Sequence, residues 1–328
     1  MLKANRRQIL LAGAGAAASL ASAAAFAQPW KPSKPIKWVI PFVPGGASDF
    51  VARAISNDLS TIAGTPVVLE NKGGSGGVIA MQDVARAAPD GHTIILGHVG
   101  TLAVAPILFP NAGYDVDKDF APVTLLATLP SVFVVHPDVP ARNLEEFVTY
   151  LKKNPEALSY ASAGNASASH LGMEHFKVTT GTSMLHVPYK GTGAALNDLL
   201  AGRTHAFNGG LSSLLSSIKA GKLRVIATGT RERIPSLPDV PTVAERGYPG
   251  FESVFWYGVL APSRTPPDVL EGLRTCLTKA LRTPAVAARF ASEDATLFGT
   301  SPSEFKTFIG QERQLWQRVI KQARIKVD

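Results

Sequence analysis

Four times along this chain, a strand-like apolar run ends at glycine or small polar residues and a helix-like segment follows directly. These junctions lie at residues 42–50, 97–101, 161–170 and 208–213. In the clearest case, "IPFVPGGASDFVARAI" at residues 40–55, a Pro-Gly-Gly turn leaves little side-chain bulk at the helix start. The first N–H groups of a helix have no partner within it, and the helix dipole places about half a positive charge there. Such helix starts, with nearby hydroxyls and amides, favour binding of a carboxylate.

The remaining segments also alternate between strand-like and helix-like patterns, which predicts an α/β fold with largely parallel sheets. A mature chain of about 300 residues is large for one core, so two α/β domains with a ligand cleft between them are favoured. Residues 231–250, rich in Pro and charge, are predicted to form a loop. Strands are predicted at residues 36–42, 66–70, 93–97, 121–135, 158–162, 184–189, 204–209, 223–229 and 256–262, and helices at 48–62, 78–88, 143–155, 164–176, 191–202 and 211–221, with three more helical segments at the C-terminal end.

Residues 1–27 have the order of regions found in an export signal. Lys3, Arg6 and Arg7 precede an apolar stretch rich in Ala, and the small-residue box that ends at Ala27 predicts cleavage there. The pair in "NRRQILLAG" indicates the twin-arginine route, with the general export route as the alternative. An uncleaved membrane anchor is disfavoured because the stretch is only weakly apolar.

Composition narrows the possible functions of the exported chain. The full sequence carries a formal net charge of +8, and part of this excess leaves with the signal. No block of five or six like charges is present, so a nucleic-acid-binding arm is not indicated. The single cysteine, Cys276, excludes an internal disulfide and a multi-cysteine metal site. No later run is long and apolar enough for a second membrane span.

Several stretches, in order along nearly the whole mature chain, resemble the substrate-binding proteins of tripartite tricarboxylate transporters, the Bug family of periplasmic receptors. These stretches are "PFVPGGASDFVAR", "VVLENKGGSGGVIAMQDVARAAPDGHTIILG", "DFAPVTLL", "NLEEFVTYLKKNP", "LSYASAGNASASHLGMEHF", "HVPYKGTGAALNDLLAGRTHAFN", "GKLRVIATGTRERIPSLPDVPTVAERGYPGF" and "GVLAPSRTPPDVL". The resemblance implies a periplasmic location and a type 2 periplasmic-binding-protein fold that closes like a Venus flytrap on a small organic acid. It implies one domain from residues 28–127 plus 252–328 and another from 128–251.

The same resemblance implies a monomer that delivers its ligand to integral-membrane permease subunits, with a sensor protein as the alternative partner. It implies no catalysis and no cofactor. The identity of the carboxylate is left open. The absence of an arginine clamp in the expected lining argues mildly against a multiply charged ligand such as citrate.

The resemblance also implies which residues bind the ligand. The Pro-Gly-Gly turn and Ser48 would form one wall, and the loop from Ser162 to His170 the other. Asp49 is expected to complement the helix dipole, with pairing to a cationic ligand group or steadying of the turn as alternatives. His98 and Val99 could set ligand size, whereas the "KGGSGG" loop is expected outside the lining. The full predicted set is Phe42, Gly45, Gly46, Ser48, Asp49, Gly100, Thr101, Ser162, Ala163, Gly164, Asn165, Ser167, His170, Tyr189 and Asn208.

The runner-up function is a secreted serine hydrolase of small esters. The stretch around Ser75 matches G-x-S-x-G, but extra residues separate it from the preceding strand, whereas a nucleophile elbow follows its strand directly. Ser167 is the other candidate nucleophile, and it would also need a nearby histidine to activate it. No dinucleotide or phosphate-binding glycine motif is present. His170 and Glu174 could share a metal, but the sequence shows no third ligand, so no metal is expected. Tyr257, at the start of a returning strand, is expected in the core.

Overall fold

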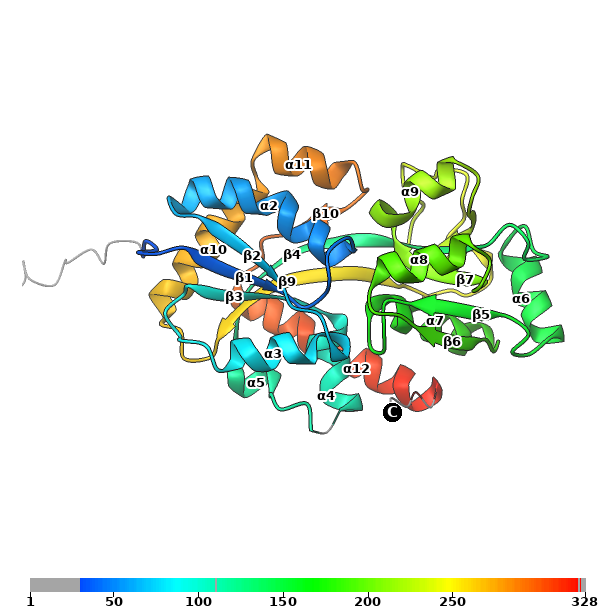
Figure 1. The fold of residues 1–328 in the computed structure, drawn as a ribbon, viewed down its shortest axis with the longest axis horizontal. Coiled ribbons are helices and arrows are strands. Elements are labelled where there is room, and N and C mark those ends of the chain that lie inside the picture. The colour runs from blue at the N-terminus through cyan, green and yellow to red at the C-terminus, as the bar shows by residue number, and fades with distance from the viewer. Residues whose placement is uncertain (1–29, 110, 324, 326–328) are drawn as a thin grey trace, which may run out of the picture. The chain divides into compact units, whose positions relative to one another are not determined.

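Two long strands, β4 (Phe120–Val135) and β9 (Val254–Pro262), run side by side through the centre of the fold (Figure 1). The computed structural model describes residues 30–109, 111–323 and 325. The helices and strands of these described residues belong to one compact unit that begins at Lys31. They form a single mixed sheet in the order β2-β1-β3-β9-β4-β7-β5-β6, with β8 and β10 also paired to β4.

The first half of the sheet is built from β1 (Ile36–Ile40), β2 (Val67–Asn71) and β3 (Thr93–His98), which are mutually parallel. The long strand β9 is antiparallel to both β3 and β4 and lies between them. The helices and short strand of this half are α2 (Ala47–Ala63), η1 (Ser75–Gly77), α3 (Val78–Ala85), η2 (Gly100–Val104), α4 (Ala105–Leu108), α5 (Val116–Asp119), α10 (Pro267–Leu281), α11 (Pro284–Ala291), β10 (Thr296–Leu297) and α12 (Pro302–Ala323).

The second half repeats the arrangement with β5 (Ser159–Ser162), β6 (Leu185–Pro188) and β7 (Ala206–Gly210), again mutually parallel. Both β7 and β8 (Arg224–Thr228) pair antiparallel with the end of β4. The helices of this half are α6 (Leu144–Lys153), α7 (Ala168–Thr180), α8 (Thr192–Leu200), α9 (Leu211–Lys219) and the short η3 (Ala244–Arg246).

Strand β4 changes partners along its length. It pairs with β9 as far as Pro130 and with β7 from Ser131 onwards. The predicted domain boundaries at residues 127–128 and 251–252 fall close to this change and close to the start of β9. The division into two domains stays a prediction, and the change of partners is the feature that supports it.

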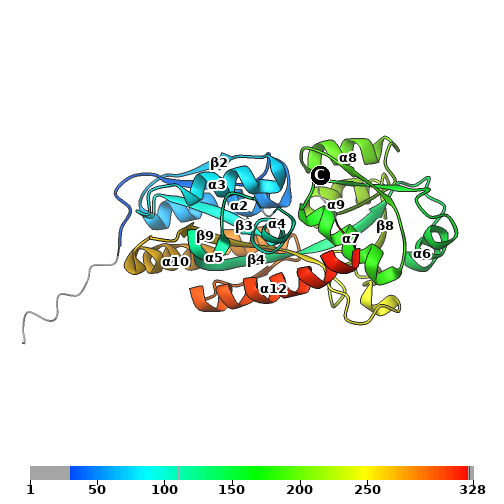
Figure 2. The same cartoon turned by 90° about the horizontal axis from the view of Figure 1, so that it is seen from below.

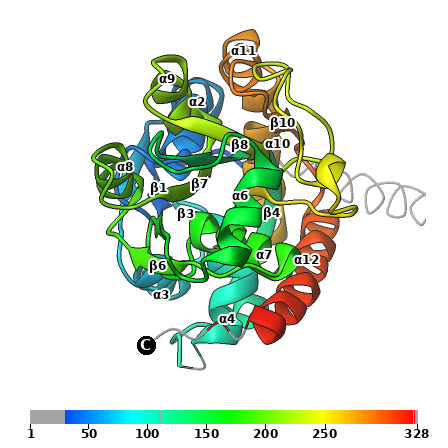
Figure 3. The same cartoon turned by 90° about the vertical axis from the view of Figure 1, so that its right-hand side faces the viewer.

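The apolar clusters follow the two halves, except that the cluster around Trp256 also includes Ala166 and Leu171 of the second half. Val39, Leu102 and Trp256 belong to the cluster of the first half. In the second half, one cluster lies around Tyr160 and Phe176, and another contains Phe207. Helix α12 extends from β4 to α7 (Figure 2), and the two helices lie side by side in the end view (Figure 3). The two halves therefore meet along α12 as well as through the sheet.

The predicted α/β fold is confirmed, with antiparallel pairing at β4 and β9 in addition to the expected parallel pairs. The Asn143 side chain caps α6, since its Oδ1 accepts a hydrogen bond from the Glu146 N–H. The Glu146 carboxylate accepts in return from the Asn143 side-chain amide and from the Arg142 N–H. Among the described residues, no helix has the length and hydropathy needed to span a bilayer. The predicted export signal lies outside the described residues.

Candidate functional site

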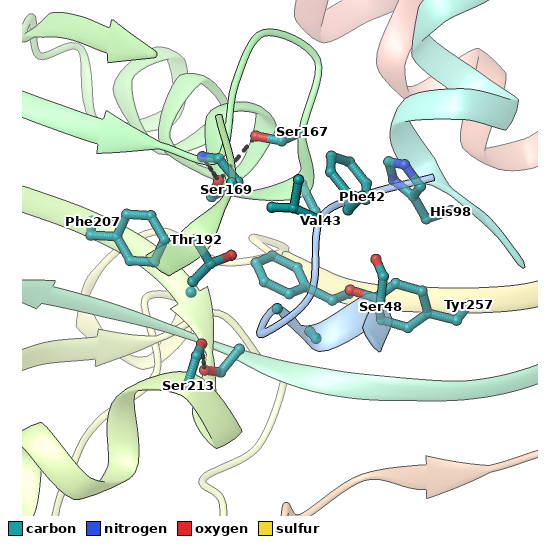
Figure 4. A pocket seen from close by; sticks show the side chains of 18 residues that line it. Phe42, Val43, Ser48, His98, Ser167, Ser169, Thr192, Phe207, Ser213 and Tyr257 are labelled. Atoms are coloured by element: carbon teal, nitrogen blue, oxygen red, sulfur yellow. Dashed lines mark hydrogen bonds between the residues drawn. The ribbon is translucent and has the colours of Figure 1, made fainter. Parts of the chain in front are cut away.

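An inner cavity of about 40 Å³ lies where the turn between β1 and α2 faces the second half of the sheet. Among the described residues that line it, none has a charged side chain, and its polar groups are hydroxyls, backbone amides and one imidazole. Figure 4 shows Phe42 and Val43 between the hydroxyl-bearing side chains of the two walls. Five residues predicted to bind ligand line this cavity: Phe42, Gly46, Ser48, Ala163 and Ser167.

Four helices begin at the inner cavity. The residues that precede α2, α8 and α9 are Gly46, Gly191 and Gly210, and all three line the cavity. In the described part of the chain, no side chain caps these three helices. Helix α7 begins after Ser167, whose hydroxyl accepts a hydrogen bond from the His170 N–H. Three uncapped N-termini create a positive potential without any charged side chain, which suits an anion.

The two walls of the cavity touch through glycines. A Cβ added at Gly100 would lie 2.1 Å from the carbonyl oxygen of Ala166, and one at Gly191 would lie 2.4 Å from Val43 Cγ2. At 40 Å³ the inner cavity has room for about one water molecule. An acid of several carbons therefore cannot lie wholly within the inner cavity.

A larger outer cavity, of about 540 Å³, adjoins the inner one and shares Phe42, Val43, Ala163 and Gly191 with it. Three further predicted residues line it, namely Gly164, Asn165 and Tyr189. Residues 73–76 also line it, which corrects the expectation that the "KGGSGG" loop lies outside the lining. The reason is close backbone packing, since a Cβ at Gly76 would lie 2.6 Å from the Asn165 carbonyl oxygen.

Asp49 is turned away from both cavities and joins the turn to the sheet. Its carboxylate accepts hydrogen bonds from the Gly45 N–H, from Arg53 Nε and from the Asn71 amide, at 2.9 to 3.1 Å. Burial works to raise the pKa of Asp49, but the hydrogen bonds, that from Arg53 first, hold it below its usual value. Of the interpretations left open by the sequence, this geometry corresponds to an acid that steadies the turn.

We expect Asp49→Asn to destabilise the protein by about 2 kcal/mol, because an amide cannot accept all of these hydrogen bonds and leaves buried donors unpaired. Urea unfolding at pH 7 measures the loss. Glu271→Gln is the matched control, since that carboxylate pairs with Arg274 at the surface and should cost under about 1 kcal/mol. Equal midpoints for the two variants would contradict the role of Asp49 in the turn.

His98, at the end of β3, lines the inner cavity and is 2% exposed. Its Nδ1 accepts a hydrogen bond of 3.0 Å from the Gly100 N–H, and its ring lies 4.9 Å from the ring of Phe42. Burial lowers the pKa of His98 to about 3. The imidazole is therefore neutral at physiological pH.

Six residues of the predicted set lie beside the cavities without lining them. Gly45 donates its N–H to Asp49, and the Thr101 hydroxyl bonds to the backbone of His98. Asn208 lies inside β7 rather than at a helix start, and a Cβ at Gly172 would lie 2.2 Å from its Oδ1. Because side chains alternate along a strand, its neighbour Phe207 faces the cavity instead. The others are Gly100, Ser162 and His170.

His170 belongs to a stack of rings behind the cavity wall. It lies 4.2 Å from His186, which in turn lies 4.8 Å from Tyr160. Its Nδ1 accepts a hydrogen bond from the Ala166 N–H, which fixes the loop that precedes α7. Burial first, then the charge of Lys177, lowers the pKa of His170 to about 4. Tyr189 donates its hydroxyl to Asp198 rather than leaving it free for the cleft.

Sequence reasoning missed one whole section of the wall. Gly191 and Thr192 form a further strand-to-helix junction, and the "YKGTG" glycines were the signal that could have identified it. Tyr257 is both buried, as expected, and part of the lining. The remaining residues outside the predicted set that line the inner cavity are Val43, Ala47, His98, Ala168, Ser169, Phe207, Gly209, Gly210, Ser213 and Phe255, and the outer cavity adds Phe109 and the charged Lys190.

The serines proposed for a hydrolase are not paired with histidine side chains in the described structure. Ser167 Oγ contacts Ser169 Oγ at 3.0 Å and caps α7. Ser75 lies in the short helix η1, separated from β2 by three residues. Other serines do contact histidines: Ser162 Oγ lies 2.6 Å from His186 Nε2, Ser159 Oγ 3.1 Å from His205 Nδ1 and Ser33 Oγ 3.4 Å from His92 Nε2, but none of these serines lines either cavity.

The sequence matches the family model described as "Tripartite tricarboxylate transporter family receptor" over residues 51–325. The chain belongs to this receptor family. A relative from Pseudomonas sp. (strain P51), the UPF0065 protein in the tcbD-tcbE intergenic region, is 39% identical, and the alignment covers 97% of this chain and 95% of that one. Protein BugT of Bordetella pertussis is 35% identical over 90% of this chain and 91% of its own. The resemblance to Bug proteins is thus confirmed.

Solved structures of similar proteins share the fold of this receptor. A protein of R. palustris with adipate is 33% identical and superposes with a TM-score of 0.86, over 90% of this chain and 99% of that chain. MatC from Rhodopseudomonas palustris with bound malate is 34% identical and superposes with a TM-score of 0.83, over 88% of this chain and 99% of that chain. The periplasmic binding protein BugD is 36% identical and superposes with a TM-score of 0.84, over 90% of this chain and 99% of that chain. The receptor therefore has the mixed α/β fold of periplasmic binding proteins.

Proposed function

We propose that this receptor captures a small organic carboxylate in the periplasm, between the two halves of its sheet, and that it has no catalytic activity. The observation that carries the proposal is the convergence of the uncapped helices α2, α8 and α9 on one uncharged cavity. Membership of the receptor family supports it, as do the adipate and malate held by similar proteins.

The carboxylate group would lie in the inner cavity. There the first N–H groups of the three helices, with the hydroxyls of Ser48 and Thr192, would donate hydrogen bonds to its oxygens. The rest of the acid would extend past Val43 into the outer cavity, whose volume is in the range that small ligands occupy. The two cavities together contain eight of the fifteen residues predicted to bind ligand. Gly45, Asp49 and the five others would support the wall rather than touch the acid.

Closure would follow binding. The halves on either side of the change of partners in β4 would act as the two predicted domains, and their approach would remove water from the carboxylate and strengthen its hydrogen bonds. A monomer in this closed form would deliver the acid to the permease subunits of a tripartite tricarboxylate transporter, or present itself to a sensor protein. The family description supports the transporter as partner.

We expect at least one of four acids, adipate, malate, succinate and benzoate, to raise the melting temperature of the protein lacking residues 1–27. A ligand that binds only the folded state stabilises it by about 2.7 kcal/mol at one hundred times its Kd. The corresponding amides should cause no shift, because they lack the negative charge that the helix N-termini attract. The proposed function would be overturned if the acids and their amides raised the melting temperature equally, or if no acid raised it.

A further inference from the structure

The imidazole of His98, which lines the inner cavity, has a buried ring nitrogen without a hydrogen-bond partner among the described residues. A backbone N–H can only donate, so the bond from the Gly100 N–H requires Nδ1 of His98 to be the acceptor. In the neutral ring the proton then resides on Nε2. That nitrogen is buried and has no hydrogen-bond partner among the described residues. His98 is thus a donor without an acceptor in the wall of the cavity.

The ring has little freedom to turn elsewhere. Its backbone N–H donates to the Thr101 hydroxyl, which also bonds to the His98 carbonyl oxygen. The ring packs against Phe42 on one side, and its Cε1 and Nδ1 lie against Gly100. A flip of the ring would break the bond from Gly100 and leave that buried N–H unpaired. The orientation of the Nε2–H group is therefore fixed by the backbone.

A buried donor with no partner destabilises the folded state, so it is normally paired with water or a ligand. The other polar side chains of the wall bear hydroxyls, which can both donate and accept, whereas this group in neutral imidazole only donates, as the backbone N–H groups at the helix starts do. We propose that Nε2–H of His98 donates a hydrogen bond to an oxygen of the bound carboxylate and helps to select an acceptor-only group at this point. This inference rests on the proposed function and assigns a specificity role to one residue within it.

The donor is neutral, which distinguishes it from the cationic side chains that commonly bind acids. A hydrogen bond from a neutral imidazole requires an acceptor at one defined place, whereas a lysine or arginine attracts any nearby negative charge. A carboxylate can present either oxygen to Nε2–H, whereas an amide must present its one carbonyl oxygen there and point its NH2 group at the donors of the helix starts. His98 would therefore contribute to discrimination between an acid and its amide.

The test uses isothermal titration of the protein lacking residues 1–27 with adipate, malate, succinate and benzoate. His98→Phe keeps a flat ring and removes the donor, and it should weaken the tightest of these acids at least tenfold. His98→Gln carries an amide N–H at a similar distance along the side chain and should recover most of the loss. His175→Phe is the matched control, since His175 also has an unpartnered ring nitrogen but packs against Phe251 and Trp316, away from the cavity.

Nitrogen-15 NMR of labelled histidine supplies a second readout. The proton of His98 should be found on Nε2 at pH 7, and its resonance should move when the acid is added. A proton on Nδ1, or an affinity of His98→Phe within threefold of the unmodified protein, would overturn the role of His98 while leaving the proposed function intact. Failure of all four acids to bind the unmodified protein would instead overturn the proposed function, and this inference with it.

Discussion

Replacing Gly100 with alanine should abolish tight ligand binding while leaving the fold intact. The new Cβ would lie 2.1 Å from the Ala166 carbonyl oxygen, far inside the contact distance that real Cβ atoms allow. The φ angle of Gly100 is not in the left-handed region, so alanine fits the local backbone. The strain arises against Ala166 and against the His98 ring, whose Cε1 would lie 2.6 Å from the new Cβ. The loop before α7 must therefore move away from Gly100. This movement increases the distance between the helix N-termini that bind the carboxylate. We expect affinity to fall about a hundredfold, or 2.7 kcal/mol.

The measurement is titration with whichever panel acid gives the largest thermal shift. Gly193→Ala is the control, because a Cβ at that position in α8 has nothing within 4 Å. Small-angle scattering with saturating acid should show Gly100→Ala remaining more expanded than the control. If Gly100→Ala binds the acid as tightly as Gly193→Ala does, the close contact between Gly100 and Ala166 is absent from the ligand-bound conformation.

Mild acid should destabilise the protein because two buried histidines are held neutral. Burial lowers the pKa of His98 to about 3 and, with the charge of Lys177, that of His170 to about 4. Both values lie below the 6.5 of an unfolded histidine. Between pH 6.5 and pH 4 the unfolded chain therefore binds more protons than the native one, and stability falls as pH falls. From pH 7.5 to 5.5 the two residues together should cost about 3 kcal/mol.

Urea midpoints measured at pH 7.5, 6.5 and 5.5 check this dependence. The double variant His98→Gln/His170→Gln should lose about half of the histidine-dependent slope over this range, because His175 and His186 remain and burial lowers their pKa values to about 4 and about 3. It should be less stable than the unmodified protein at pH 7.5 and closer to it at pH 5.5. A double variant whose midpoint falls with pH as steeply as that of the unmodified protein would assign the acid sensitivity to other groups.

The sequence was sufficient to predict the elements but not how the chain orders them in the sheet. Apolar periodicity and glycine turns predicted β1, α2 and the elements from α6 to β8 close to their observed bounds. Nothing in that pattern indicates that β9, more than 150 residues after β3, lies between β3 and β4. Pairing of strands distant in sequence depends on the packing of the whole sheet, and local propensity carries no information about it.

The candidate site was predictable where backbone chemistry defines it. Gly46 and Ser48 follow from the Pro-Gly-Gly turn, and both line the cavity. Asn208 was misplaced because the face to which a strand residue points depends on register, and a shift of one residue reverses it. The loop at residues 73–76 was excluded because its contact with Asn165 is tertiary.

The position of β9 also constrains the order in which the chain can fold. Strands β3 and β4 are both made early in synthesis, yet each leaves an edge unpaired until residues 254–262 are available to lie between them. Exposed edges of this kind are prone to pair with other chains. Because contacts between such distant segments form slowly, the first half of the sheet is completed late, after the second half has all its strands. A nascent chain that ends before Pro262 therefore lacks the centre of its own sheet and depends on a chaperone, or on continued synthesis, to remain soluble.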